Sequence, residues 1–126
     1  MKVNKLKYDQ SKELRIDSEN IVSILSDAYA RFMGKNLKWN PHKHLVIDTD
    51  KLRASAEVAG DYGILKCDCG YPECIDLSPI EVSHFEEKGE QYIEWLMYPP
   101  MHQGDRSEDR LRFVFHKPQY VRAIAG

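Results

Sequence analysis

The chain has 126 residues, of which 18 are basic and 20 are acidic, so its net charge is −2. A chain of this length is expected to fold as one domain covering residues 1–126. The near balance of charge argues against a protein that binds nucleic acid by neutralising phosphates. No apolar run approaches the ~18 residues that a membrane span needs, and the N-terminal segment lacks the apolar stretch of a secretory signal.

The N-terminal third predicts a hairpin followed by a long helix. Val3–Tyr8 and Glu13–Asp17 have the composition of two short strands on either side of a polar turn. Ser18–Met33 carries apolar residues at three- and four-residue spacing, which is typical of one buried helical face. Ser18 is the expected N-cap of this helix, and Gly34 suits the left-handed position that ends it.

The middle of the chain predicts two strands separated by a helix. His44–Thr49 is apolar enough for a short strand. A short helix is expected near residues 51–59, with Asp50 as its cap and Gly60 as its stop. Tyr62–Cys67 is then expected to form one further strand that leads into a cysteine-rich turn.

The C-terminal half predicts a hairpin, a core strand and a terminal helix. Ile80–Phe85 and Tyr92–Tyr98 alternate apolar and polar residues around a turn at Glu86–Glu90. Leu111–Phe115 alternates in the same way. A short helix near residues 118–125 begins at a proline, which is tolerated in a first helical turn. This order of elements indicates an α+β fold, with a largely antiparallel sheet, one long N-terminal helix and two short helices.

All three cysteines of the chain lie in one stretch, Cys67-Asp68-Cys69-Gly70-Tyr71-Pro72-Glu73-Cys74. An odd number of cysteines argues against a disulfide framework and favours a reducing compartment, the cytoplasm. The first interpretation is a structural turn formed by Cys67, Cys69, Gly70 and Cys74, in which the thiols pack as small apolar groups.

Zinc binding by Cys67, Cys69 and Cys74 is the alternative interpretation of this turn. A structural zinc site is closed by four ligands, so a histidine from elsewhere in the chain would have to complete it. A redox-active pair is disfavoured, because the acidic neighbours in the turn would raise the pKa values of the thiols.

A small hydrolase using His42, His44 and Asp48 is the third hypothesis. In an extended segment the two histidines point to one face, where they could form an acid–base or metal-binding pair. No recognisable partner motif follows them, so the preferred interpretation is that the histidines are surface residues, and that Asp48 and Asp50 mark a strand exit followed by the helix cap.

The region around the second hairpin is acidic. Residues 81–94 contain five glutamates and a single lysine, and residues 101–110 add further carboxylates. A negative surface of this kind accelerates encounter with a basic partner. The expected partner-binding residues are Glu86, Glu87, Glu90, Asp105 and Glu108.

Aromatic residues lie beside this acidic region. Trp95, Tyr92 and Tyr98 are either core residues or anchors of the kind found at the centre of protein interfaces. The sequence leaves both alternatives open.

Four segments carry a resemblance to known proteins: Ala59-Gly60-Asp61-Tyr62, the cysteine turn, Ile93-Glu94-Trp95, and Phe113–Tyr120. Over residues 59–126 the chain resembles a group of small bacterial proteins with a Cys-x-Cys-Gly-x-x-x-Cys turn and a terminal Gln-Tyr segment. In size, style and charge it also resembles immunity proteins of bacterial toxin systems, such as contact-dependent growth inhibition.

The second resemblance implies a cytoplasmic protein without catalysis of its own, which occludes the active site of a toxin domain. We therefore expect a protein partner, no cofactor, and neither a nucleic-acid nor a membrane partner. The zinc-binding module and the small hydrolase are the alternatives.

Overall fold

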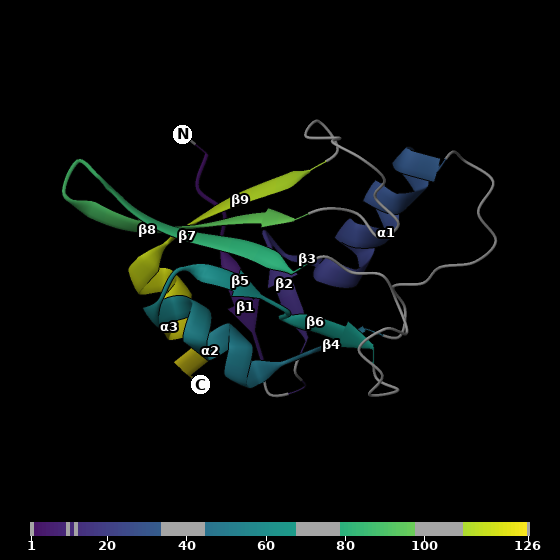
Figure 1. Ribbon diagram of the computed structural model, residues 1–126, viewed down its shortest axis with the longest axis horizontal. Coiled ribbons are helices and arrows are strands. Elements are labelled where there is room, and N and C mark those ends of the chain that lie inside the picture. The colour runs from purple at the N-terminus through teal and green to yellow at the C-terminus, as the bar shows by residue number, and fades with distance from the viewer. Residues whose placement is uncertain are drawn as a thin grey trace.

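The computed structural model describes residues 2–9, 11, 13–33, 45–67, 79–97 and 110–125. Within these ranges the strands form antiparallel sheets, as predicted, but they are divided among three separate sheets, which three helices accompany (Figure 1). The strands are β1 (Leu6–Tyr8), β2 (Leu14–Ile16), β3 (Glu19–Asn20), β4 (Leu45–Ile47), β5 (Gly60–Tyr62), β6 (Leu65–Cys67), β7 (Ile80–Glu87), β8 (Glu90–Met97) and β9 (Leu111–His116). The helices are α1 (Ile21–Met33), α2 (Thr49–Glu57) and α3 (Lys117–Ala125).

The prediction of a long N-terminal helix from Ser18 is wrong. Helix α1 begins at Ile21 and has 13 residues, which is an ordinary length for a globular protein. Ser18 lies with Asp17 in the turn between β2 and β3, where their φ angles are 72° and 53°. The pairing of β3 with β2 uses the residues expected to form the first helical turn. The side chain of Asn20 caps α1 instead, accepting the Val22 N–H at 2.8 Å.

The second sheet pairs β4 with β6, and α2 follows β4 directly. Asp48, not the predicted Asp50, is the N-cap of α2 and accepts the Lys51 N–H at 3.3 Å. The predicted strand Tyr62–Cys67 is divided between two sheets: β5 pairs with β7, and β6 pairs with β4. The division falls at Ile64, whose carbonyl accepts the Asp48 N–H at 2.7 Å and whose side chain is buried.

The third sheet has the strand order β5-β7-β8-β9. Strands β7 and β8 pair along their whole length, from Glu81 with Leu96 to Glu87 with Glu90. The turn is therefore the two residues Lys88 and Gly89, shorter than the predicted turn at 86–90. Their φ angles are 54° and 81°, and two successive positive φ values match the right-handed twist of the flanking strands in a tight hairpin.

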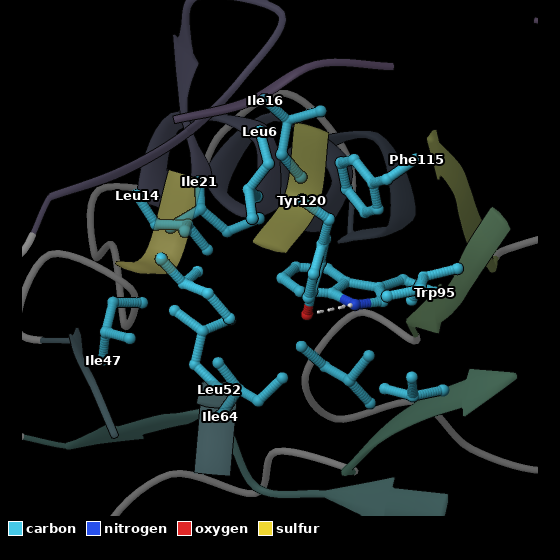
Figure 2. Packing of buried hydrophobic residues seen from close by; sticks show 14 of the residues in the cluster. Leu6, Leu14, Ile16, Ile21, Ile47, Leu52, Ile64, Trp95, Phe115 and Tyr120 are labelled. Carbon is cyan, nitrogen blue, oxygen red and sulfur yellow. Dashed lines mark hydrogen bonds between the residues drawn. The ribbon is translucent and has the colours of Figure 1, made fainter. Parts of the chain in front are cut away.

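The core face of this sheet packs against α3 and the N-terminal sheet (Figure 2). Trp95 is fully buried and meets the rings of Phe115 and Tyr120 edge-on, at centroid distances of 5.1 and 6.0 Å. This geometry suits the quadrupoles of aromatic rings. All three sheets and all three helices contribute side chains to the same hydrophobic cluster.

A chain of hydrogen bonds crosses this core. The Trp95 indole N–H donates to the Tyr120 hydroxyl at 3.2 Å, which lies 2.6 Å from the Ser55 hydroxyl (Figure 2). Ser55 Oγ donates to the Leu52 carbonyl at 2.5 Å, so Tyr120 must donate to Ser55. The side chains of Trp95, Tyr120 and Ser55 therefore all have hydrogen-bond partners. This matters because an unpaired polar group in the core would lower the stability of the folded state.

The N-terminal strand is held by side chains from the end of the chain. Gln119 Oε1 accepts the Leu6 N–H at 3.0 Å, and Gln119 Nε2 donates to the Leu6 carbonyl at 2.6 Å. Asn4 uses its backbone N–H and its side-chain oxygen in the same way on Val114, at 2.6 and 3.0 Å. The terminal Gln-Tyr segment therefore has a structural role: Gln119 fixes β1 to α3, and Tyr120 completes the buried hydrogen-bond chain.

We predict that Tyr120→Phe lowers the free energy of unfolding by about 1–3 kcal/mol, because it leaves the buried Trp95 N–H without an acceptor. Denaturant unfolding measures this change. Tyr92→Phe is the matched control, because Tyr92 lies outside the core cluster, and it should cost less than about 0.5 kcal/mol. Equal losses in both variants would contradict a special role for the buried hydroxyl.

Alkaline pH provides an independent test. Burial raises the pKa of Tyr120 from 10.0 to about 12. Because the folded state holds this proton more tightly, the resulting stability is fully present below pH 10 and is lost as the pH rises from 10 to about 12. Across this window the wild type should lose about 2–3 kcal/mol more than Tyr120→Phe, measured by denaturant unfolding at a series of pH values. Parallel pH profiles would refute the assignment.

Candidate functional site

The hairpin β7–β8 projects beyond α2 and α3 at one end of the molecule (Figure 1). Its tip carries Glu86, Glu87 and Glu90, and all three are exposed. These are three of the five residues predicted to bind a partner. The tight turn at Lys88 and Gly89 places Glu87 opposite Glu90 on one face of the hairpin, and Glu86 lies on the other face. The other two, Asp105 and Glu108, lie outside the described residues.

Ion pairs divide the glutamates of this hairpin into two groups. Glu90 Oε2 lies 2.6 Å from His116 Nε2, and Glu94 Oε2 lies 2.6 Å from Arg112 Nη2. No described residue forms a hydrogen bond or an ion pair with the carboxylates of Glu86 or Glu87. The negative charge of these two residues is therefore the part of the tip that remains available to another molecule.

The face of the hairpin turned away from the core carries an aromatic row. Phe85, Tyr92 and His116 lie opposite one another on β7, β8 and β9. Phe85 and Tyr92 stack at a centroid distance of 5.3 Å, and Tyr92 and His116 lie 5.7 Å apart. Each of the three side chains is half-buried. The row gives the projecting hairpin a firm outer surface beside the acidic tip.

Trp95 and Tyr92 were each expected to be either a core residue or an anchor in a protein interface, and the structure places both. Trp95 has no exposed surface and belongs to the core. Tyr92 lies on the outer face, where a partner could reach it, and Tyr98 is not among the described residues. Phe85 and His116 were missed by sequence reasoning, although the strand alternation around a correctly placed turn would have put Phe85 opposite Tyr92.

Two hollows border the hairpin. One of about 240 Å³ lies against β7, β8 and the start of α3, and its lining includes His84, Glu86 and Lys117. The other, of about 420 Å³, includes Phe85 and Val114 on the outer face together with Lys2 near the N-terminus. Both are shallow surface features that suit contact with a macromolecule.

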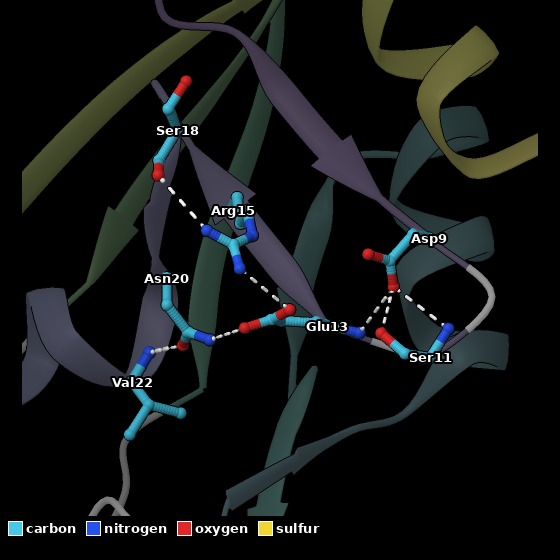
Figure 3. Close-up of polar contacts among 7 residues, drawn as sticks. All are labelled: Asp9, Ser11, Glu13, Arg15, Ser18, Asn20 and Val22. Carbon is cyan, nitrogen blue, oxygen red and sulfur yellow. Dashed lines mark hydrogen bonds and ion pairs between the residues drawn. The ribbon is translucent and has the colours of Figure 1, made fainter.

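A second polar cluster lies on the N-terminal sheet (Figure 3). Asp9 accepts hydrogen bonds from the N–H and hydroxyl groups of Ser11, and the hydroxyl bond lowers the pKa of Asp9 below its usual value. Glu13 accepts from Arg15 at 3.0 Å and from the Asn20 amide. These contacts fix the turns that begin and end β2, and the cap of α1. They account for the cluster structurally.

The cluster borders a groove of about 340 Å³ whose opposite wall is the small sheet of β4 and β6. Its lining includes Glu13, Asn20 and Val46 and is mainly aliphatic. Glu13 and Asn20 already have hydrogen-bond partners. The groove therefore presents few free polar groups that could orient a ligand.

The alternative sites lie mostly outside the described residues. This applies to Cys69, Gly70 and Cys74 of the cysteine turn, whereas Cys67 ends β6 with its backbone paired to Leu45. Zinc binding and the structural turn both stay predictions. In the ranges that can be described, no group of three or more potential metal ligands occurs.

Of the three residues of the hydrolase hypothesis, only Asp48 is among the described residues. His42 and His44 also fall outside the described ranges. Asp48 caps α2 and lies 3.7 Å from Lys66 Nζ. Asp48 therefore lies at the expected strand exit, but it also takes the capping role that was predicted for Asp50.

Comparisons with family models, curated proteins and solved structures give no significant match for this chain. The resemblance to small bacterial proteins with a cysteine turn, and the looser one to immunity proteins, therefore stay predictions. Among the helices that the structure describes, none is long and apolar enough to cross a membrane.

We predict that Gly89→Ala destabilises the protein by about 1 kcal/mol, because a φ of 81° is unfavourable for a residue with a Cβ. Gly63→Ala is the matched control, since its added Cβ would meet only the end of the Lys51 side chain at 3.5 Å. The control should be neutral or slightly stabilising. Thermal unfolding of both variants checks the assignment of the hairpin turn, and a neutral Gly89→Ala would argue against it.

Proposed function

We propose that this chain is a non-catalytic cytoplasmic binding protein, which engages a basic protein partner through the acidic tip of the β7–β8 hairpin. The observation that carries the proposal is the pairing pattern of the tip. Glu86 and Glu87 are exposed and lack ion-pair partners among the described residues, whereas Glu90 contacts the His116 imidazole and Glu94 pairs with Arg112.

The rigidity of the tip supports this role. The two-residue turn and the full ladder between β7 and β8 fix the backbone that carries the carboxylates before a partner arrives. A preorganised group loses less entropy on binding than one on a mobile loop. The stacked rings of Phe85 and Tyr92 stiffen the hairpin further and provide apolar surface beside the charge.

An immunity protein is the form of this function that we propose. Toxins that cleave nucleic acid need basic active-site clefts to hold phosphates. A projecting acidic hairpin complements such a cleft in shape and in charge, and its insertion would exclude the substrate. Electrostatic complementarity of this kind acts mainly on the rate of association and on specificity.

We predict that the double variant Glu86→Gln/Glu87→Gln binds its partner roughly tenfold more weakly, mostly through slower association at low ionic strength. The partner to test first is the product of the adjacent open reading frame, co-expressed and assayed by pull-down and then by binding kinetics. The folded state should be as stable as that of the wild type, because neither carboxylate has a described partner to lose.

The matched control is Glu19→Gln/Asp27→Asn, which removes the same charge at two exposed positions on β3 and α1. Equal weakening by both double variants would indicate a general effect of net charge and not a site. A neighbouring gene product that is neither toxic nor bound would count against the immunity function.

A further inference from the structure

Strand β7 is longer than its neighbour β5, and this leaves part of one sheet edge open. On one side β7 pairs with β8 as far as Glu87. On the other side β5 pairs only with residues 80–82. Within the described ranges, no strand accompanies residues 83–87 on that side, which is the part of β7 in the projecting hairpin (Figure 1).

The local chemistry explains why β5 stops where it does. Val58 N–H donates to the Ala54 carbonyl at 3.1 Å and so closes the end of α2. The segment before Gly60 therefore uses its backbone to end a helix and is not available to extend the ladder toward His84. The open edge is a consequence of the short connection between α2 and β5.

The backbone groups along this edge alternate in direction. Glu87 and Glu90 flank a two-residue turn and so form a hydrogen-bonded pair. Because successive residues of a strand direct their N–H and C=O groups to opposite edges, those of His84 and Glu86 point away from β8. These backbone groups have no hydrogen-bond partner among the described residues.

A hydrogen bond from the His84 side chain to α2 holds the open edge of β7 in place. His84 Nε2 lies 2.7 Å from the Ser55 carbonyl. A carbonyl oxygen only accepts, so the imidazole carries its proton on Nε2. This bond ties β7 to α2 immediately beside the open edge. The small hollow that includes His84 and Glu86 in its lining lies at the same place.

The surroundings of the edge are acidic and partly apolar. Glu57, Asp61, Glu81, Glu86 and Glu87 are all exposed on α2, β5 and β7. Val58, the C-cap of α2, is 63% exposed, which is the largest exposure of any large apolar side chain among the described residues. An edge with this charge repels a second copy of itself and attracts a basic strand.

We propose that residues 83–87 form a docking edge, at which an extended basic segment of the partner protein pairs as an added strand. Main-chain hydrogen bonds to His84 and Glu86 would supply the affinity, and lysine or arginine side chains facing the flanking carboxylates would supply the specificity. This inference rests on the proposed function and adds the mode of recognition to it.

Hydrogen exchange on the wild-type protein tests the docking edge directly. The probe is a short synthetic peptide that alternates lysine with valine, and the control is the same peptide with glutamate in place of lysine. At saturation the basic peptide should slow exchange of the His84 and Glu86 amides at least about tenfold, since an amide bonded to an added strand exchanges only after opening. The acidic peptide should leave both unchanged.

Unchanged exchange at both amides with the basic peptide, or protection confined to the aromatic face of the hairpin, would overturn the proposal. Protection that rises with protein concentration in the absence of peptide would identify a second copy as the occupant and would overturn it equally. Because this readout needs no variant, it decides the question even if a substitution prevents folding.

A pair of substitutions separates the docking edge from the acidic tip. Glu86→Pro removes the outward N–H, and proline is tolerated on a sheet edge, whereas Glu86→Ala removes the same charge and keeps the N–H. Glu86→Pro should bind the basic peptide and the partner at least about tenfold more weakly than Glu86→Ala does. If both variants bind equally while Glu86→Gln/Glu87→Gln is impaired, the proposed function stands and the docking edge fails. If none of the three is impaired, both fail.

Discussion

One buried chain of hydrogen bonds holds the four-stranded sheet and helices α2 and α3 together. It runs from the Trp95 indole through the hydroxyls of Tyr120 and Ser55 to the Leu52 carbonyl. These residues come from β8, α3 and α2, so a single polar connection joins the four-stranded sheet to both short helices. Aliphatic packing alone tolerates small shifts, but donors and acceptors that satisfy one another allow only one arrangement. This hydrogen-bond chain therefore fixes the position of α2 and of α3 on the sheet.

The same hydrogen-bond chain also orients the acidic β7–β8 hairpin, through Ser55. Ser55 contributes its hydroxyl to the buried chain and its carbonyl to His84. Strand β7 is thus fixed to the same residue that fixes α2 and α3. The end of this hairpin projects beyond α2 and α3 (Figure 1), and the exposed Glu86 and Glu87 lie there. A site that must present charge in a defined direction benefits from such a rigid attachment.

Alternation of apolar and polar side chains predicted the β7–β8 hairpin and the last core strand, because burial on one face leaves a period of two in the sequence. Backbone conformations that carry no such pattern were missed. Nothing in its residue type shows that Ser18 takes a positive φ in a turn, and a serine there equally predicts a helix cap. The division of the predicted strand at Ile64 depends on pairing with strands distant in sequence. For the candidate site, composition indicated Glu86, Glu87 and Glu90, but the contact of Glu90 with His116 could be found only from the register of β9.

The clamp between Gln119 and Leu6 links positions 113 residues apart. During synthesis the N-terminal strand emerges long before the helix that satisfies its backbone. Contacts of such long sequence separation form late and slow folding. The backbone groups of Leu6 therefore stay without their native side-chain partner until Gln119 has been synthesised. The native contact between β1 and α3 forms only after both segments are present.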